Sequence, residues 1–210
     1  MNVYLDNAST SFPKPKAVCD SIYNFLANIG GNSGRSNHTN ALESNRYVFD
    51  TRENIASFFN FPKIENVIFT NNITSSLNIL INGILKKGDH VITSSIEHNS
   101  VIRPLWNLKE SNIIDLDITE ANSLGIINVE SIKTLIKPNT KLIILTHASN
   151  VLGTIQPIKE IGKLCKENNI FFILDSAQSA GVLSVDFSEL NLSALTFTGH
   201  KSLLLSLIHI

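Results

Sequence analysis

Short apolar segments alternate with amphipathic segments from about residue 65 onward, and this alternation restricts the fold more than any other feature of the chain. The expected strands cover residues 67–69, 90–93, 142–145, 170–174 and 194–198. Between them, apolar residues recur at the spacing of one helix face, as in 73–85, 131–136 and 158–165. Strands separated by helices form a mainly parallel sheet with helices on both faces. We therefore predict an α/β fold with three layers, α/β/α.

The composition allows a substantial core and argues against two classes of partner. A hydrophobic content of 43% in 210 residues is enough for an enzyme-sized domain. The 17 Lys and Arg residues balance 18 Asp and Glu residues, so no nucleic acid or membrane surface is indicated as a partner. The chain lacks the pattern of a secretion signal and of a membrane helix of roughly 18 apolar residues. We expect a cytoplasmic protein that binds a small molecule or another protein.

The two cysteines do not indicate a disulfide framework or a metal site. Cys19 and Cys165 are too few and too far apart for either, so we expect reduced thiols and no bound metal. Cys165 falls on the apolar face of the helix that follows Pro157, and Cys19 falls in an expected helix near the N-terminus. We predict that both are packing residues.

Polar side chains follow one expected strand after another, at the edge where ligands bind in open α/β sheets. Asp175 ends a very apolar strand, where a carboxylate needs a cationic or hydrogen-bonding partner, although capping of the next helix is an alternative. Lys201 follows another buried strand, where desolvation favours a nucleophilic neutral amine, but strand-end lysines are usually solvated. His98 is suited to stack on an aromatic ring and exchange protons, or is a surface-loop histidine.

Three further positions carry weaker signals. Thr74 and Ser75 open the helix that begins near Ile73, where free backbone N–H groups and the helix dipole favour a phosphate, or where the side chains only cap the helix. Asn150 and Gln178 offer hydrogen bonds to a ring hydroxyl, or are turn residues. These signals gain weight from their order along the chain.

In that order the chain resembles the cysteine desulfurases of the class-V aminotransferase family, which are pyridoxal-phosphate enzymes of fold type I. The resemblance extends from Tyr4 to about Leu203. Two motifs behind strands carry most of it, Asp175-Ser176-Ala177-Gln178 and Thr198-Gly199-His200-Lys201. It is also carried by the segments 4–10, 66–70, 88–92, 97–100 and 147–153.

The resemblance implies a role for each of these positions toward pyridoxal 5'-phosphate. Lys201 holds the cofactor and later moves protons, Asp175 keeps the pyridine nitrogen protonated, and His98 stacks on the ring. Asn150 and Gln178 meet the ring hydroxyl. The phosphate is expected at Ile73, Thr74, Thr198 and His200.

The chain departs from the family after Lys201, where a turn with glycine and proline and a long second region are expected. We therefore expect residues 1–15 to be an N-terminal arm, 16–204 an incomplete cofactor-binding large domain, and 205–210 a non-native or misread tail. The C-terminal small domain is then missing, with the persulfide-forming cysteine and the carboxylate-binding arginine. Ser75 stands where the family commonly has glutamate.

The resemblance implies conversion of L-cysteine to L-alanine, with the sulfur passing to an enzyme cysteine. Transamination and selenocysteine cleavage are alternatives within the family, and a non-catalytic cofactor-binding remnant is an alternative of another class. The family also implies a homodimer when full length, and a sulfur-acceptor protein as a partner.

Overall fold

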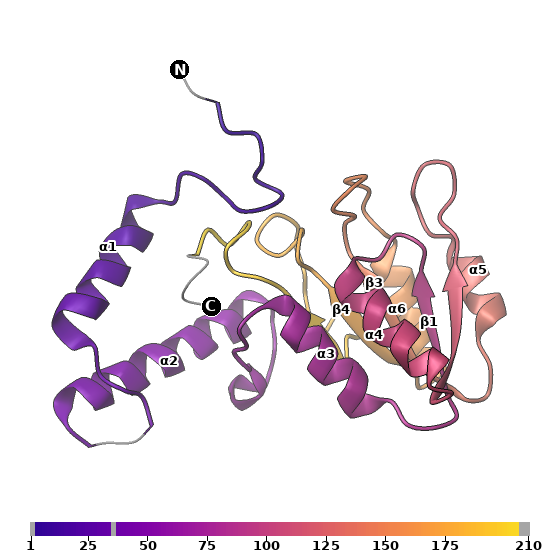
Figure 1. Ribbon diagram of the computed structural model, residues 1–210, viewed down its shortest axis with the longest axis horizontal. Helices are drawn as coiled ribbons and strands as arrows, with labels where there is room; N and C mark the ends of the chain where they lie inside the picture. Colours follow the sequence, from indigo (N-terminus) through magenta and orange to yellow (C-terminus); the bar gives the residue numbers. More distant parts are fainter. Residues whose placement is uncertain (1–2, 35–36, 206–210) are drawn as a thin grey trace.

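The computed structural model of the protein describes residues 3–34 and 37–205. Its centre is a five-stranded sheet in the order β2-β1-β3-β4-β5, and every pair of neighbouring strands is parallel. This confirms the predicted α/β class (Figure 1). The strands are β1 (Asp89–Ser94), β2 (Ile114–Thr119), β3 (Thr140–Thr146), β4 (Phe171–Asp175) and β5 (Ala194–Thr196).

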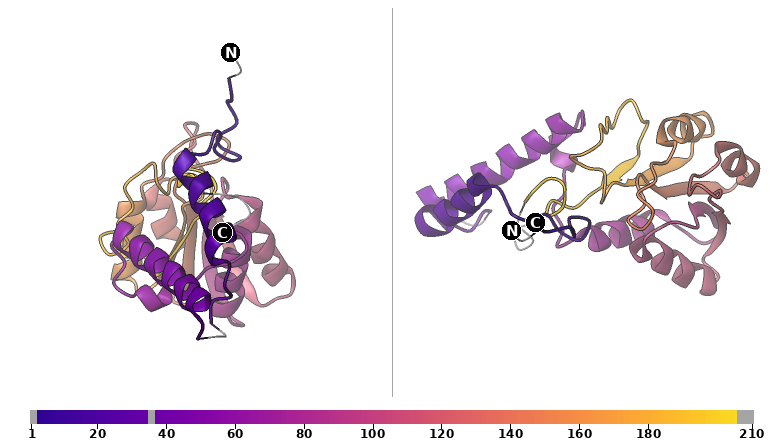
Figure 2. Two further views of the ribbon diagram at one scale, coloured as in Figure 1. Left: turned by 90° about the vertical axis from the view of Figure 1, so that its left-hand side faces the viewer. Right: turned by 90° about the horizontal axis from the view of Figure 1, so that it is seen from above.

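Helices cover both faces of the sheet, which gives the three predicted layers (Figure 2). One apolar cluster joins α3 and α4 to the sheet through Leu77, Ile81, Val101 and Leu105, and the other joins α5 and α6 to its opposite face. The helices are α1 (Lys16–Asn24), α2 (Thr39–Phe58), α3 (Ile73–Ile84), α4 (Asn99–Glu110), α5 (Val129–Leu135) and α6 (Ile158–Glu167), with a π-helical turn η1 (Phe25–Ile29) and a 3-10 turn η2 (Ile64–Asn66).

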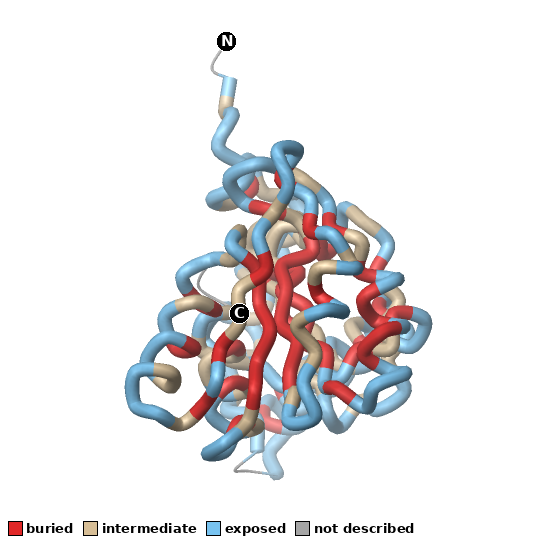
Figure 3. Tube along the Cα trace, turned by 90° about the vertical axis from the view of Figure 1, so that its right-hand side faces the viewer, coloured by how far each residue is buried: buried red, intermediate tan, exposed pale blue. Residues whose placement is uncertain are grey.

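The central strands are buried on both faces, as expected for a parallel sheet between two helical layers. In β3 the run Leu142–Leu145 is completely buried, and in β4 only Phe171 is exposed. Figure 3 shows these buried segments passing through the middle of the molecule between exposed loops. Their continuous apolar sequence therefore reflects burial from two sides.

The predicted strand 67–69 is wrong. These residues follow η2 as an extended segment that pairs with no strand among the described residues, and Ile68 and Phe69 are exposed. A short apolar run forms a strand only when a neighbouring strand pairs with it. Among the described residues β5 pairs with β4 and not with residues 67–69. Conversely, β2 was not predicted, although its sequence Ile114-Asp115-Leu116-Asp117 alternates apolar and acidic residues as a half-buried strand does.

The N-terminal third of the chain extends away from the sandwich. Helices α1 and α2 project to one side, and α1 contains no buried residue (Figure 1). Cys19 on α1 is exposed, so the prediction that it packs in a core is wrong, whereas Cys165 on α6 is fully buried as predicted. The expected tail 205–210 lies outside the described residues except for Leu205.

None of the helices in ranges 3–34 and 37–205 is both long and apolar enough to cross a membrane. The N-terminal arm, residues 3–15, has no helix or strand and lies against the loop that carries Lys201. The two segments run side by side in Figure 1 and in the right-hand view of Figure 2.

Candidate active site

A cavity of about 330 Å³ opens at the carboxyl edge of the sheet. It lies where the strand order turns back on itself, between β1 and β3, which is the usual ligand position in open α/β sheets. Residues that follow β1, β3, β4 and β5 meet there with the N-terminal arm. The lining consists of Asp6, Ala8, Ser9, Ile73, His98, Ser100, Thr146, Ala148, Asn150, Asp175, Ala177, Gln178 and Lys201.

Asp175 is the last residue of β4 and is only 3% exposed. One carboxylate oxygen, Oδ1, accepts a hydrogen bond from the backbone N–H of Ala177 at 2.9 Å. Burial raises the pKa of Asp175, while that hydrogen bond and the charges of His98 and Lys201 act to lower it. No cation within the described chain comes close enough to form an ion pair with it. A buried acid that faces a cavity in this way favours a cationic ligand group.

Lys201 lies in the turn after β5 and is half-buried. Burial lowers the pKa of its ammonium, and the charge of Asp175 partly opposes that shift. A lowered pKa increases the fraction of neutral amine, which is the form that attacks a carbonyl carbon. Lys201 therefore combines the position and the chemistry of a nucleophile.

His98 caps the N-terminus of α4 and lines the cavity. Its Nδ1 accepts a hydrogen bond from the backbone N–H of Ser100 at 3.1 Å and lies 2.7 Å from Ser100 Oγ. Both contacts hold the imidazole ring through one of its nitrogens. The ring lines the cavity, and His98 is exposed, so its stacking role and the alternative of a surface-loop histidine both stay predictions.

The two predicted amide side chains also reach the cavity. Asn150 follows β3 and is exposed, and Gln178 lies three residues after Asp175. Gln178 Nε2 donates a hydrogen bond to the carbonyl oxygen of Ala8 at 3.2 Å, so this side chain also fixes the arm to the cavity wall.

The expected phosphate residues are only partly brought together. Ile73 lines the cavity, but Thr74, Thr198 and His200 are not among its lining residues. The cap of α3 is Asn72, whose Oδ1 accepts from the backbone N–H of Ser75 at 2.8 Å, which leaves Thr74 exposed in the first turn. The N-terminus of α3 is thus presented toward the same edge of the sheet as Lys201.

Sequence reasoning missed the arm residues Asp6, Ala8 and Ser9, which line the cavity. The segment 4–10 belongs to the motifs that carry the family resemblance, but its composition assigns it no chemistry. It also missed Glu97, whose carboxyl group is enclosed although it directly precedes the predicted His98. A charged residue beside a functional histidine gives no sign in the sequence of which way it points.

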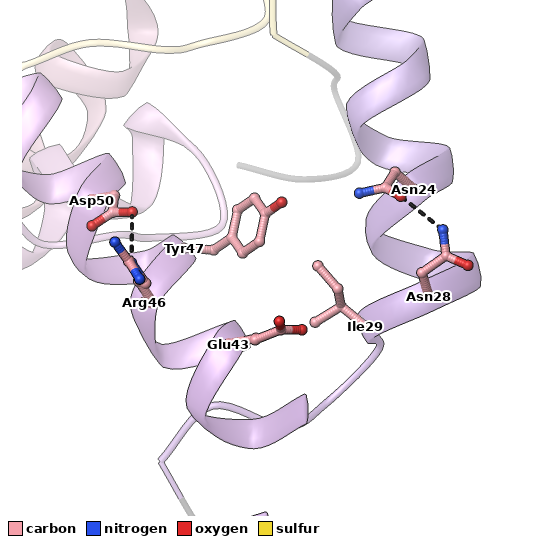
Figure 4. A pocket seen from close by; sticks show the side chains of 7 residues that line it. All are labelled: Asn24, Asn28, Ile29, Glu43, Arg46, Tyr47 and Asp50. Atoms are coloured by element: carbon pink, nitrogen blue, oxygen red, sulfur yellow. Dashed lines mark hydrogen bonds and ion pairs between the residues drawn. The ribbon is translucent and has the colours of Figure 1, made fainter. Parts of the chain in front are cut away.

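A second cavity, of about 510 Å³, lies between η1 and α2, far along the chain from the motifs (Figure 4). Asn24, Asn28, Glu43, Arg46 and Tyr47 line it, and Arg46 pairs with Asp50 at 3.7 Å. It holds neither cysteine and none of the predicted site residues. In the described ranges no cluster of three or more His, Cys, Asp or Glu side chains could hold a metal.

The cavity at the sheet edge fits pyridoxal phosphate. The buried carboxylate of Asp175 lacks a cationic partner, which a protonated pyridine nitrogen supplies, and Lys201 offers an amine of lowered pKa. His98, which follows β1, can contact a flat ring in the cavity. Backbone N–H groups at the start of α3 can bind an anion. The donor set and the charge of the site therefore agree with this cofactor.

A parallel α/β/α sandwich with a buried aspartate and a lysine at its carboxyl edge is the architecture of a fold-type-I pyridoxal-phosphate enzyme. Within that class, the model of the family described as aminotransferase class-V matches residues 3–205. The chain belongs to that family. Its members are enzymes that depend on pyridoxal phosphate.

Curated relatives and solved structures agree with this assignment. A probable cysteine desulfurase of Borreliella burgdorferi is 36% identical over 206 residues, which cover 96% of this chain and 49% of the relative. One of Methanothermobacter thermautotrophicus is 33% identical and is covered to 50%. The apo cysteine desulfurase of Thermococcus onnurineus superposes with a TM-score of 0.90 at 31% identity, covering 96% of this chain and 50% of that structure. The chain thus spans about half the length of these relatives.

Proposed function

We propose that the protein is a cysteine desulfurase, which converts L-cysteine to L-alanine and passes the sulfur to an enzyme cysteine as a persulfide. The single observation that carries the proposal is that Asp175, which is buried without an ion-pair partner among the described residues, lines the same cavity as Lys201. The names of the relatives support the substrate. So does a structure of SspA in complex with cysteine, which superposes with a TM-score of 0.88 at 32% identity.

Pyridoxal phosphate, when bound, supplies an electron sink for the carbanion that forms beside the substrate amino group. Lys201 Nζ would hold the cofactor and would move protons at the substrate as a base. The Asp175 carboxylate stabilises positive charge on the ring nitrogen, since its burial leaves water unable to do so. His98, whose imidazole is held by its contacts with Ser100, would stack on the ring.

The remaining predicted residues orient the cofactor. Asn150 and Gln178 hydrogen-bond the ring hydroxyl, and Gln178 is held in place by the carbonyl of Ala8. The phosphate would be held at the N-terminus of α3, beside Ile73, by the first-turn backbone N–H groups that the Asn72 cap does not use. Its further ligands are Thr74, Thr198 and His200.

Transfer of sulfur from the substrate needs a reactive cysteine at the cavity. Neither Cys19 nor Cys165 lines the cavity. Cys165 is buried in the core, and burial raises its pKa to about 12, so it remains a thiol. Cys19 is exposed on α1 and does not line the cavity. Two alternatives are kept beside desulfuration, a class-V aminotransferase or selenocysteine lyase reaction, and a cofactor-binding chain without turnover. A homodimer, a sulfur-acceptor partner and a cytoplasmic location remain parts of the proposal.

Borohydride reduction followed by peptide mapping tests the cofactor site. We expect reduced cofactor on Lys201 in the wild type and in Lys163→Ala, and none on that peptide in Lys201→Ala. Lys163 is a matched control because its side chain is 77% exposed, on the outer face of α6. Attachment elsewhere in the chain would contradict the proposed role.

Substrate assays then separate the reactions. Alanine and persulfide formed from cysteine support desulfuration, and selenide release with no reaction of cysteine supports selenocysteine cleavage. Amino transfer that depends on a keto acid, with no sulfur release, supports transamination. Trapped cofactor without any turnover supports the non-catalytic chain.

A further inference from the structure

We propose that the N-terminal arm positions Lys201, through Ser11 and Lys14, which hold the peptide between His200 and Lys201. The inference rests on the proposed function in one respect, that Lys201 is the residue that holds the cofactor. It assigns a role to a segment that contains no helix or strand and lies about 190 residues from the lysine in sequence.

Four donors of the arm converge on one backbone oxygen, the carbonyl oxygen of His200. Lys14 Nζ donates to it at 2.6 Å, Thr10 Oγ1 at 3.0 Å, and Ser11 at 3.1 Å through Oγ and 3.2 Å through its backbone N–H. A carbonyl oxygen has two lone pairs, so this is twice the ordinary number of donors. The oxygen belongs to the peptide group directly before Lys201.

Lys14 and Ser11 act as one unit. Lys14 Nζ also donates to Ser11 Oγ at 2.6 Å, so the ammonium polarises a hydroxyl that itself donates to the same carbonyl oxygen. Charge-assisted hydrogen bonds of this length are about twice as strong as neutral ones. Ser11 is 7% exposed, in contrast to the exposed residues on both sides of it in the arm, from Asp6 to Ser9 and at Phe12. The contact of Ser11 with residues 197–204, the loop that carries Lys201 (the lysine loop), therefore anchors the arm.

The lysine loop has few restraints of its own. Strand β5 ends at Thr196, and no helix or strand covers residues 197–204. The local backbone bonds are those from the N–H of Leu204 to Lys201 and from the N–H of Leu205 to Gly199, at 2.9 and 2.8 Å. Neither bond fixes the His200–Lys201 peptide to the sheet. The arm does so from outside, and it is tied in turn to the cavity wall through Gln178.

The position of that peptide matters because displacement of a reacting group by about 1 Å can reduce a rate by about 100-fold. The arm also places a positive charge beside His200. Burial, Lys201 and Lys14, in that order, lower the pKa of His200 and so favour its neutral form.

The test compares Ser11→Ala, Lys14→Met and the double variant with Lys16→Met. Lys16 is a matched control, because it lies two residues further on, is 86% exposed and pairs with the exposed Asp20. Hydrogen exchange is measured first, in the protein without cofactor. We expect the amides of Leu204 and Leu205 to exchange at least about 10-fold faster in the double variant, with β3 still protected. Lys14→Arg keeps a charged donor and is expected to restore most of the protection.

The rate of covalent attachment at Lys201 is measured second, after mixing with pyridoxal phosphate. We expect it to fall about 10-fold in Lys14→Met and in the double variant, and to stay unchanged in Lys16→Met. Unchanged exchange at Leu204 and Leu205 in Lys14→Met would overturn the inference, whatever the attachment rate. If exchange rises but even the wild type attaches no cofactor at Lys201, the arm still holds the loop and the proposed function fails. If the double variant loses protection in β3 as well, it is destabilised as a whole. The exchange of Leu204 and Leu205 in Lys14→Met then decides whether the inference holds.

Discussion

Glu97 Oε1 accepts a hydrogen bond from the backbone N–H of Thr146 at 3.0 Å, so a side chain that follows β1 is bound to the last residue of β3. Ser94 Oγ donates to the same oxygen at 2.5 Å, while Oε2 is enclosed without a hydrogen-bond partner. Burial raises the pKa of Glu97 to about 8, and the charge of Asp175 adds to the shift. The ends of β1 and β3 are thus joined by a carboxyl group that is mainly protonated at neutral pH.

This carboxyl group makes the stability depend on pH. Its pKa rises from 4.5 to about 8 on folding, so between these values the folded state holds a proton that the unfolded state has released. Stability therefore falls as the pH rises from about 5 to 8, in total by on the order of 4 kcal/mol. Glu97→Gln removes this contribution, which urea unfolding at several pH values measures. Glu110→Gln, at an exposed position, should keep the wild-type slope, and an equal slope in Glu97→Gln would contradict the assignment.

Asp175→Asn is expected to raise the stability of the protein and to lower its activity. Burial of the charge raises the pKa of Asp175, so the ionised carboxylate costs stability at pH 7 when no cation faces it. The amide keeps the hydrogen bond from Ala177 and loses the charge. We expect the unfolding temperature of the cofactor-free protein to rise by about 3 °C. Alanine release by the cofactor-loaded protein should fall at least about 100-fold, because the ring nitrogen loses its buried ion pair. A variant with wild-type turnover would remove Asp175 from the mechanism.

Replacement of two helical glycines by alanine is expected to change the free energy of unfolding in opposite directions. A Cβ at Gly162 of α6 would lie 2.0 Å from the carbonyl oxygen of Leu190, so Gly162→Ala forces the helix away from that segment. We expect a loss of at least about 3 kcal/mol in the free energy of unfolding. At Gly83 of α3 nothing lies within 4 Å, and Gly83→Ala should stabilise the protein by about 0.5–1 kcal/mol. Urea unfolding of both variants checks the pair, and similar effects of both would refute the packing of α6.

His90 forms a buried polar chain at the opposite edge of the sheet. Its Nδ1 lies 2.8 Å from Thr140 Oγ1, and its Nε2 lies 3.0 Å from Asp117 Oδ2, which also pairs with Lys137 at 2.6 Å. Asp117 only accepts hydrogen bonds, so the Nε2–H of a neutral ring donates to it. Nδ1 then accepts from the hydroxyl of Thr140, whose Oγ1 accepts from the backbone N–H of Lys137.

Burial and Lys137 lower the pKa of His90, against the opposing effects of Asp117 and Asp115. A folded-state pKa below the unfolded value of 6.5 means that this group costs stability as the pH falls through 6.5. The difference in unfolding free energy between wild type and His90→Gln should therefore shrink from pH 7.5 to pH 5. Chemical denaturation at these two values measures it. A difference that grows on acidification would show that the ring is charged in the folded protein.

Much of the sheet was predictable, because burial from both sides leaves uninterrupted apolar runs such as Leu142–Leu145 in β3. The same rule failed at 67–69, where an apolar run has no neighbouring strand to pair with. It failed in the opposite sense at β2, which lies at the edge of the sheet and carries Asp115 and Asp117. Pairing partners are a property of the whole fold, which a local pattern does not contain.

The residues of the site also fall into a group that the sequence predicted and a group that it did not. Asp175, Gln178, His98, Asn150 and Lys201 were predicted, because each follows a strand and strand ends of a parallel sheet share one edge. The arm residues, the enclosed Glu97 carboxyl group and the exposure of Cys19 were not predicted. Each depends on which distant segment packs against it.

The sequence by itself determined the α/β class, the family and the chemical groups that follow the central strands, because apolar periodicity and motif order are recorded along the chain. Only the tertiary structure decided that the N-terminal arm contacts the carbonyl of His200, and that the carboxyl group of Glu97 is enclosed and joins the ends of β1 and β3. Hydrogen bonds and desolvation act through space between residues far apart in sequence. Their partners and strengths are therefore set by the fold.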